Sequence, residues 1–365
     1  MVTGYAYDAL NRVLTKQSSD INTFAYGYIY DTCRTGNLCE IRRNAAAHLS
    51  FGYDGLGRIN YQMSLIGLFI SRYAYSPGGR LTQITYPNGR TVDYAYDFHI
   101  SGNPKVGNII QVTTTANGVP TVLASDIQYH PFGPVKGFSF GNGLSYWMNL
   151  DQAYRPGLHS SGPRSKIASY DPAGNLKTLA DMNGKVQSFG YDALDELSSA
   201  ADTQAGSYGS LSYTYIKNGH RKTEVRNGVS TTYSYLGSNR LFYTTARYWS
   251  YDAAGNVISD STLGTLTYDG YGQLATVGAT VYDYDALGRR VTKTVNDVTT
   301  SFHYAPPGEL LYETGKRAYV YLNGMLLARV DNNSVYYYHT DALGAPQLMT
   351  DATGTTVWRG RYEPF

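Results

Sequence analysis

Aspartates that follow a tyrosine are the most regular source of potential chemistry in this sequence. Tyr-Asp pairs stand at residues 7–8, 53–54 and 284–285, among other places. A row of carboxylates could supply acid and base groups for hydrolysis or oxygen ligands for Ca²⁺. Ca²⁺ sites, however, need several oxygen ligands in one loop, as in a D-x-D-x-D-G string, and no such string occurs. We therefore expect these aspartates to form turns, since an Asp side chain can accept hydrogen bonds from nearby backbone N–H groups.

The histidines have no spacing that is typical of a metal site or a catalytic site. They stand at positions 48, 99, 130, 159, 220, 303 and 339. The sequence contains no H-E-x-x-H, G-x-S-x-G, Walker or dinucleotide-binding pattern. His339 and Asp341 are close together without a marked nucleophile, so we expect a structural role in a turn. The sequence predicts no enzyme, with no catalytic, metal-binding or cofactor-binding residue and no cofactor.

The two cysteines, Cys33 and Cys39, flank a segment with the Gly-Asn chemistry of a hairpin turn. They could face each other across neighbouring strands and form a disulfide, which would fit an oxidising compartment. The alternative is two unpaired thiols in a cytosolic protein. A zinc site is not expected, because two cysteines without nearby paired histidines cannot complete four ligands.

The composition favours strands joined by tight turns. The chain has 37 tyrosines and 39 glycines among 365 residues, and only 16% of its residues are charged. The net charge is +2 and the lysines and arginines are scattered, so the sequence shows no basic patch of the kind that binds nucleic acid. The most apolar run, Leu65 to Ile70, is too short to span a bilayer and is expected to be one buried strand. Residues 1–8 leave no room for a signal peptide, so an export signal would have to lie elsewhere.

One short pattern recurs along most of the chain: an aromatic pair, an Asp, and a turn that contains Gly and often ends in Arg. Its tyrosines step by about 22 residues near the N-terminus and by about 16 or 17 residues between positions 235 and 284. Each unit therefore reads as two strands and two turns. The motif residues are Tyr7, Asp8, Tyr53, Asp54, Gly57, Arg58, Tyr284, Asp285, Gly288 and Arg289.

The physics of one unit predicts a β-hairpin. Asn-Gly at 218–219 lies between strands expected at 212–215 and 222–225, and Asn-Gly at 227–228 follows the second strand. Asn-Gly supplies the positive φ angles of tight turns. The motif Arg is expected to pair with the Asp or to lie across a tyrosine ring, for at most about 1 kcal/mol if exposed. Hairpins without a core of their own must stack, with tyrosines in ladders. A strip of some thirty strands would be on the order of 140 Å long and should curl into a spiral or wall.

The motif Tyr-Asp-x-x-Gly-Arg at this spacing resembles the YD repeat of the Rhs family, which includes bacterial polymorphic toxins, the C components of insecticidal toxin complexes and teneurin shells. Residues 127–144 and 336–365 also resemble segments of bacterial Rhs proteins, the second being similar to the stretch that leads into the Rhs core-associated region. The resemblance divides the chain into repeats (1–97), a less regular segment (98–165), repeats (166–335) and a closing segment (336–365). The closing segment contains His339, Asp341, Leu343, Gly344, Pro346, Trp358, Tyr362 and Pro364.

The resemblance implies an all-β fold of antiparallel hairpin repeats in a long curled or spiral sheet, which in toxin members encloses a C-terminal toxic domain. That domain is released by aspartyl self-cleavage at an Asp-Pro motif downstream of the segment matched here. The sole Asp-Pro pair, Asp171-Pro172, stands in an ordinary repeat turn and is assigned no cleavage. We expect a non-catalytic, exported bacterial shell fragment whose flanking shell and cargo segments are missing. Its open strand edges should favour self-association, and no nucleic acid or membrane span is expected.

Three alternatives remain open. A surface module for carbohydrate binding or adhesion would use Trp147, Trp249 and Trp358 to stack on sugar rings, although core or inter-repeat packing is the simpler role for these residues. A self-assembling extracellular β-repeat polymer would use the open edges. A propeller or β-helix glycosidase ranks last, because propeller repeats are usually about 40 residues or longer.

Overall fold

The computed structural model describes residues 2–20, 22–97, 107–131, 133–204, 206–315 and 317–364. Within these ranges, all regular secondary structure is β-strand. The strands are antiparallel, and within each sheet a strand pairs with its neighbours in the sequence. The predicted all-β fold of antiparallel hairpins is confirmed.

The strands fall into two long sheets that meet at one isolated bridge between Tyr243 and Tyr248. The first sheet has 22 strands: β1 (Thr3–Tyr7), β2 (Val13–Ser18), β3 (Tyr26–Tyr30), β4 (Leu38–Arg43), β5 (Ala46–Tyr53), β6 (Ile59–Ser64), β7 (Phe69–Tyr75), β8 (Leu81–Thr85), β9 (Thr91–Tyr96), β10 (Ile109–Ala116), β11 (Val119–Tyr129), β12 (Val135–Phe140), β13 (Ser145–Leu150), β14 (Pro156–Ser161), β15 (Arg164–Tyr170), β16 (Leu176–Asp181), β17 (Val186–Tyr191), β18 (Leu197–Asp202), β19 (Ser210–Tyr215), β20 (Arg221–Arg226), β21 (Val229–Tyr235) and β22 (Leu241–Thr244).

The second sheet has 13 strands: β23 (Trp249–Tyr251), β24 (Val257–Asp260), β25 (Gly264–Tyr268), β26 (Leu274–Val277), β27 (Thr280–Tyr284), β28 (Arg290–Val295), β29 (Val298–Tyr304), β30 (Leu310–Glu313), β31 (Arg317–Leu322), β32 (Met325–Asp331), β33 (Ser334–Thr340), β34 (Pro346–Thr350) and β35 (Thr356–Arg359). The boundary between the sheets lies inside the predicted repeat segment 166–335. The division into four segments, which came from the family resemblance, stays a prediction.

The hairpin of β20 and β21 shows how the sequence builds these sheets. Arg226 pairs with Val229, so only Asn227 and Gly228 form the turn. Both have positive φ angles, 49° and 85°, which Asn and Gly adopt more readily than other residues. This turn and the predicted strand 222–225 are confirmed, and the other predicted strand, 212–215, lies within β19.

The prediction of one buried strand over Leu65–Ile70 is wrong. Strand β6 ends at Ser64 and β7 begins at Phe69, and the chain reverses between them. Gly67 and Leu68 take positive φ angles of 76° and 52°, and Leu68 is 73% exposed. The apolar composition suggested a strand, but a Gly that adopts the left-handed conformation allows the chain to reverse even among apolar neighbours.

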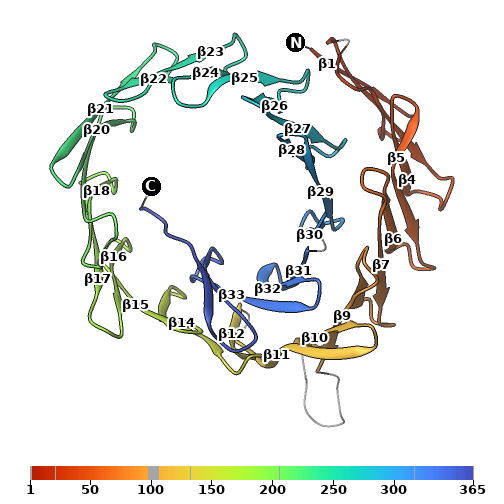
Figure 1. Ribbon diagram of the computed structural model, residues 1–365, viewed down its shortest axis with the longest axis horizontal. Helices are drawn as coiled ribbons and strands as arrows, with labels where there is room; N and C mark the ends of the chain where they lie inside the picture. The colour runs from red at the N-terminus through yellow and green to blue at the C-terminus, as the bar shows by residue number, and fades with distance from the viewer. Residues whose placement is uncertain are drawn as a thin grey trace.

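The two sheets wind as one spiral (Figure 1). Strands β1–β24, here called the outer turn, run once around the ring, and strands β25–β35, the inner turn, continue inside it along β1–β14. The right-handed twist of strands prevents so long a sheet from staying flat. The prediction of a curled or spiral sheet is confirmed.

The main hydrophobic core lies between the two turns, in the contact here called the seam. It joins buried residues of the outer turn from Phe69 to Met148 with buried residues of the inner turn from Ala305 to Tyr337. A second, smaller cluster joins Ile41 and Leu49 of the outer turn to Ala286 of the inner turn. A single strip of hairpins has one face without a partner, so the overlap of the turns supplies the second layer that a core requires.

Candidate functional site

The repeated turn is organised by its aspartate, as the unit at Asp54 shows. Asp54 Oδ1 accepts hydrogen bonds from the backbone N–H groups of Leu56, at 2.9 Å, and of Arg58, at 3.0 Å. Its Oδ2 accepts one from Arg58 Nε at 2.6 Å, which holds the pKa of Asp54 below its usual range. Gly57 has a φ of 82° and donates its N–H to the Asp54 carbonyl. The carboxylate is thus occupied by the turn that it forms.

The arginine of each unit also contacts the next unit. The Arg58 guanidinium lies 4.6 Å from the ring centroid of Tyr75 and donates to the Ser76 carbonyl at 3.1 Å. The prediction that the motif Arg pairs with the Asp or lies across a tyrosine ring is confirmed, since Arg58 does both. At these positions the tyrosine ring packs against a guanidinium and not against another tyrosine. The same pairing recurs at Arg12–Tyr30, Arg80–Tyr96, Arg155–Tyr170, Arg240–Tyr251 and Arg289–Tyr304.

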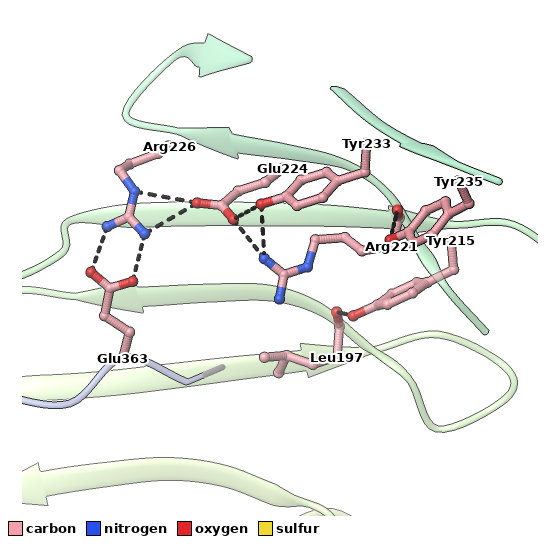
Figure 2. Close-up of polar contacts among 8 residues, drawn as sticks. All are labelled: Leu197, Tyr215, Arg221, Glu224, Arg226, Tyr233, Tyr235 and Glu363. Atoms are coloured by element: carbon pink, nitrogen blue, oxygen red, sulfur yellow. Dashed lines mark hydrogen bonds and ion pairs between the residues drawn. The ribbon is translucent and has the colours of Figure 1, made fainter. Parts of the chain in front are cut away.

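The tyrosine before each turn contacts the preceding unit. The Tyr53 hydroxyl donates to the Leu38 carbonyl at 2.7 Å, and burial raises the pKa of Tyr53. Figure 2 shows the same bond from Tyr215 to Leu197 and from Tyr235 to Arg221. Each unit is therefore fixed to both of its neighbours, by the tyrosine on one side and by the arginine on the other.

Copies of the motif with nearly identical sequences lie in different surroundings. Tyr7, near the N-terminal edge of the first sheet, is 53% exposed, and Asp8, whose side chain is 18% exposed, pairs with its arginine at 2.6 Å. Asp285 is only 1% exposed, because its turn sits in the seam. Gly288 has a φ of 79°, and Arg289 pairs with Asp285 at 2.7 Å. The carbonyl of Tyr284 accepts a hydrogen bond from Tyr26 of the outer turn.

The closing segment repeats the turn with small variations. Asp341 Oδ1 accepts hydrogen bonds from the N–H groups of Leu343 and Ala345, both at 2.9 Å. Gly344 takes the left-handed position, with a φ of 87°, and Pro346 begins β34. Leu343 is 92% exposed, whereas His339 is fully buried in the seam. His339 and Asp341 therefore do not form a pair on a common surface.

The end of this segment borders a cavity. Trp358 and Tyr362 are 42% and 51% exposed and line a cavity of about 300 Å³ together with Tyr338 and Arg329. The Tyr362 hydroxyl donates to the carbonyl of Pro346 at 2.7 Å. Pro364 follows in an extended stretch. This cavity combines aromatic walls with a guanidinium group.

The other two tryptophans are engaged within the sheets. Trp147 Nε1 donates to Asn149 Oδ1 at 2.8 Å, and its ring lies below the ammonium of Lys136. Trp249 Nε1 donates to Asp260 Oδ2 at 2.7 Å, next to the break between the two sheets. Neither Trp147 nor Trp249 lines the cavity beside Trp358.

Cys33 and Cys39 are joined by a disulfide with a Cα–Cα distance of 5.5 Å. The prediction placed them on neighbouring strands, but Cys33 lies in the loop that leads from β3 to β4, and only Cys39 lies on a strand. The bond ties this loop to β4, and the backbone N–H of Cys33 also donates to the Cys39 sulfur at 2.8 Å.

A charged cluster that the sequence did not reveal fixes the C-terminal residues to the opposite wall (Figure 2). Arg226 bonds to both carboxylate oxygens of Glu363, at 2.9 and 2.6 Å, and to Glu224 at 3.1 Å. Glu224, only 9% exposed, also accepts a hydrogen bond from Tyr233. Glu363 is 137 residues away from Arg226, so no local spacing could have indicated the contact.

The same stretch makes a second contact with this wall, from Arg361 to the carbonyl of Gly206. Residues 360–364 thus leave β35 and cross the inside of the ring toward β18–β20 (Figure 1). Among the residues that the structure describes, no group of three or more His, Cys, Asp or Glu side chains is placed to hold a metal ion. His99, Phe132 and Phe365, which the sequence reasoning included, lie outside the described residues.

The comparisons with known proteins agree with this geometry. The family model described as RHS protein matches residues 335–365, and the model described as RHS Repeat matches residues 170–207. The chain is an Rhs/YD-repeat protein. Both matched stretches of this Rhs/YD-repeat chain contain an Asp-centred turn, at Asp341 and at Asp171.

Two curated proteins illustrate the relationship. The tRNA3(Ser)-specific nuclease WapA of Bacillus spizizenii is 30% identical over 258 residues, which cover 54% of this chain and 11% of WapA. The double-stranded DNA deaminase toxin A of Burkholderia cenocepacia is 23% identical over 80% of this chain and 24% of the toxin. The Rhs/YD-repeat chain therefore spans between about a tenth and a quarter of the length of these relatives.

A solved structure of the TcdB2-TccC3-Cdc42 complex shares the fold. It superposes with a TM-score of 0.78 at 16% identity, over 99% of this chain and 23% of that chain. TcdB2-TccC3 without its hypervariable C-terminal region superposes with a TM-score of 0.73. The Rhs/YD-repeat chain thus has a shell-like fold similar to that of toxin-complex components. Within its described residues, no helix is long and apolar enough to cross a bilayer.

Proposed function

We propose that this chain is a non-catalytic wall segment of a β-shell that encloses or presents a toxin cargo. The observation that carries this function is the closed course of the outer turn, with the inner turn and the C-terminal residues on its inside (Figure 1). The motif side chains support a wall role, because their polar groups are used in bonds between hairpins. A wall that is bonded from unit to unit can enclose a space without chemistry of its own.

In this proposal the catalysis named for the relatives belongs to other parts of the longer proteins. The matched stretch is 11% of the WapA nuclease and 24% of the deaminase toxin. Purified residues 1–365 should neither cleave tRNA nor deaminate double-stranded DNA above the background of the buffer. Either activity, if it is lost when a single wall residue is replaced, would overturn the assignment.

Enclosure is tested on the natural longer protein by limited proteolysis. A domain that follows the repeats should resist proteinase K while the wall is intact and become sensitive when the wall is loosened by Gly141→Ala. Digestion of that domain at the same rate in both proteins would contradict enclosure.

In this proposal the protein is exported and acts outside the producing cell, and its partners are its own flanking shell and cargo segments. The Cys33–Cys39 disulfide fits an oxidising compartment.

Self-association is a further proposed property. Within the described residues, β1 pairs only with β2, and β35 pairs only with β34. Unpaired strand edges recruit further strands. Sizing of residues 1–365 at low micromolar concentration should show oligomers, whereas a stable monomer would count against open, adhesive edges and against a self-assembling polymer.

A second candidate function, carbohydrate binding, is favoured by the cavity beside Trp358 and Tyr362. Exposed aromatic faces next to a guanidinium are suited to sugar rings. A glycan array probed with the wild-type chain and with Trp358→Ala tests it. Binding that disappears in a folded Trp358→Ala protein would support this function, and the absence of binding by the wild type would remove it.

A further inference from the structure

The seam between the two turns contains four buried histidines. His48 and His159 lie on the outer turn, in β5 and β14, and His303 and His339 lie on the inner turn, in β29 and β33. Their exposed fractions are 3%, 7%, 1% and 0%. The wall function proposed above uses none of them, and it offers no reason for titratable groups at this contact.

His303 is held against the outer turn as a neutral ring. Its Nε2 lies 2.9 Å from Ser71 Oγ, and its Nδ1 has no hydrogen-bond partner among the described residues. The ring of Phe69 packs against it with the centroids 5.7 Å apart. The charged group that acts on it is the cationic Arg289, and burial, with a smaller contribution from Arg289, lowers the pKa of His303 to about 4. A proton on His303 would therefore be buried without a counter-charge.

His339 occupies an equivalent position farther along the seam. Its Nε2 lies 2.8 Å from Thr350 Oγ1, and its Nδ1 lies 3.4 Å from Ser161 Oγ of the outer turn. The ring of Phe140 is 4.7 Å away, and burial lowers the pKa of His339 to about 4. Its neighbours from both turns are thus hydroxyl groups and an aromatic ring, which stabilise a charge less well than a carboxylate does.

The other two histidines have mixed charged surroundings. His159 is acted on by Asp341 of the inner turn and by Arg164, yet burial still lowers its pKa to about 4. Burial also lowers the pKa of His48, and the Nε2 atoms of both rings lack a partner among the described residues. The charged groups that act on His48 are Arg43, Asp285, Asp283 and Arg289.

We propose that the seam is an acid-operated latch: in mild acid, protonation of its buried histidines releases the inner turn from the outer turn, while the hairpins of each turn stay folded. Separation exposes all four rings to water, where they can carry a charge. The latch depends only on contacts between the two turns of this chain, so it does not rest on the proposed cargo.

The direction in which pH changes the stability of the seam follows from the pKa values of its histidines. In separated turns the histidines would titrate near 6.5, whereas His159, His303 and His339 in the closed seam titrate at about 4. Their stabilisation of the seam is complete above pH 6.5 and is lost as the pH falls from 6.5 through 4. At pH 5 each of the three shifts the equilibrium roughly 30-fold toward separation.

The hairpin turns respond in a different pH range. Hydrogen bonds from Arg58 hold the pKa of Asp54 below 3.8, and those from Arg12 do the same for Asp8. Stability from a carboxylate with a lowered pKa is present above its ordinary pKa and is lost only as the pH falls through the lowered value. The turns should therefore persist at a pH at which the seam has opened.

Hydrogen–deuterium exchange at pH 7 and at pH 5, corrected for intrinsic rates, tests the latch on residues 1–365. Exchange should rise in the seam strands β5–β15 and β27–β34 and stay slow in the wall β16–β21, which lies outside the seam, with an unchanged far-ultraviolet circular dichroism spectrum. The double variant His303→Gln, His339→Gln should lower the opening midpoint, because Gln keeps a hydrogen-bonding group but gains no charge. His220→Gln, on the wall outside the seam, should leave the midpoint unchanged.

Equal loss of protection in β16–β21 would show global acid unfolding and would overturn the latch. A double variant that opens at the wild-type midpoint would overturn it as well. If the double variant fails to fold, the histidine ring resonances of the wild type decide: seam histidines that gain their proton below pH 6.5, at the pH at which seam exchange rises, support the latch. Titration of every histidine near pH 6.5 without a change in exchange refutes it.

Discussion

The hydroxyl of Tyr86 on the outer turn donates a hydrogen bond of 2.7 Å to the backbone carbonyl of Tyr319 on the inner turn. These residues are 233 positions apart in sequence, and Tyr86 is 1% exposed. Tyr94 makes the same kind of bond to the carbonyl of Tyr321 at 3.2 Å. The two turns are thus joined by side-chain hydroxyls that reach backbone groups, in addition to their hydrophobic core.

Replacement of Tyr86 by Phe should weaken the seam. The change removes the hydroxyl and leaves the Tyr319 carbonyl without that donor, which should cost about 1 to 3 kcal/mol. Urea unfolding followed by tyrosine fluorescence measures this loss. Tyr5→Phe, at a tyrosine that is 50% exposed, is the matched control and should change the midpoint little. Equal effects of both changes would contradict the importance of the contact between turns.

The same turn motif should differ in its contribution according to burial. Asp285→Ala leaves Arg289 and two backbone N–H groups without their acceptor inside the seam, and should destabilise the protein by about 3 kcal/mol or more. Asp8→Ala removes the same bonds at a more exposed position, and its effect should be clearly smaller. Thermal unfolding of both variants makes the comparison. A larger effect at Asp8 would be inconsistent with the position of Asp285 in the seam.

Close packing at Gly141 should make that glycine irreplaceable. A Cβ there would lie 1.9 Å from the carbonyl oxygen of Val122, so the backbone must shift, at a cost of about 2 to 3 kcal/mol. Gly27→Ala is the control, because a Cβ at Gly27 meets no atom within 4 Å. Calorimetry should show a strong loss of stability for Gly141→Ala and little change for Gly27→Ala.

Reduction of the Cys33–Cys39 disulfide should have a modest effect. The bond closes a short loop with a sequence separation of 6, for which loop-closure entropy predicts about 2 kcal/mol. Unfolding with and without a reducing agent tests this value, with the Cys33→Ser, Cys39→Ser variant as a control for side effects of the reductant. Failure of the reduced protein to fold would show that the disulfide does more than restrict the conformations of the unfolded chain.

Changes in Glu363 should affect only the C-terminal contact. Glu363→Gln removes the charge that bonds to Arg226, a pair exposed enough for its contribution to be about 1 kcal/mol at most and to fall with salt. Global stability should change little, while residues 359–364 should become sensitive to proteases. Unchanged protease resistance of these residues would show that other contacts hold them against β18–β20.

The sequence by itself determined the hairpins and their turns. Asp54, Gly57 and Arg58 form their turn from local backbone requirements, which are the same at every copy of the motif. The family resemblance that these repeats carried is matched by the family models and by the shared fold. Local chemistry of this kind is readable because the atoms that interact are only a few residues apart.

The tertiary structure alone decided which copies of the motif are buried. Asp8 and Asp285 stand in nearly identical sequences, yet only Asp285 lies in the seam, because the curvature of the sheet brings the inner turn against β3–β5. The bond between Arg226 and Glu363 likewise depends on where the spiral places its end. The physical reason is that small twists at each pair of strands add up over the whole sheet, and no local pattern records their sum.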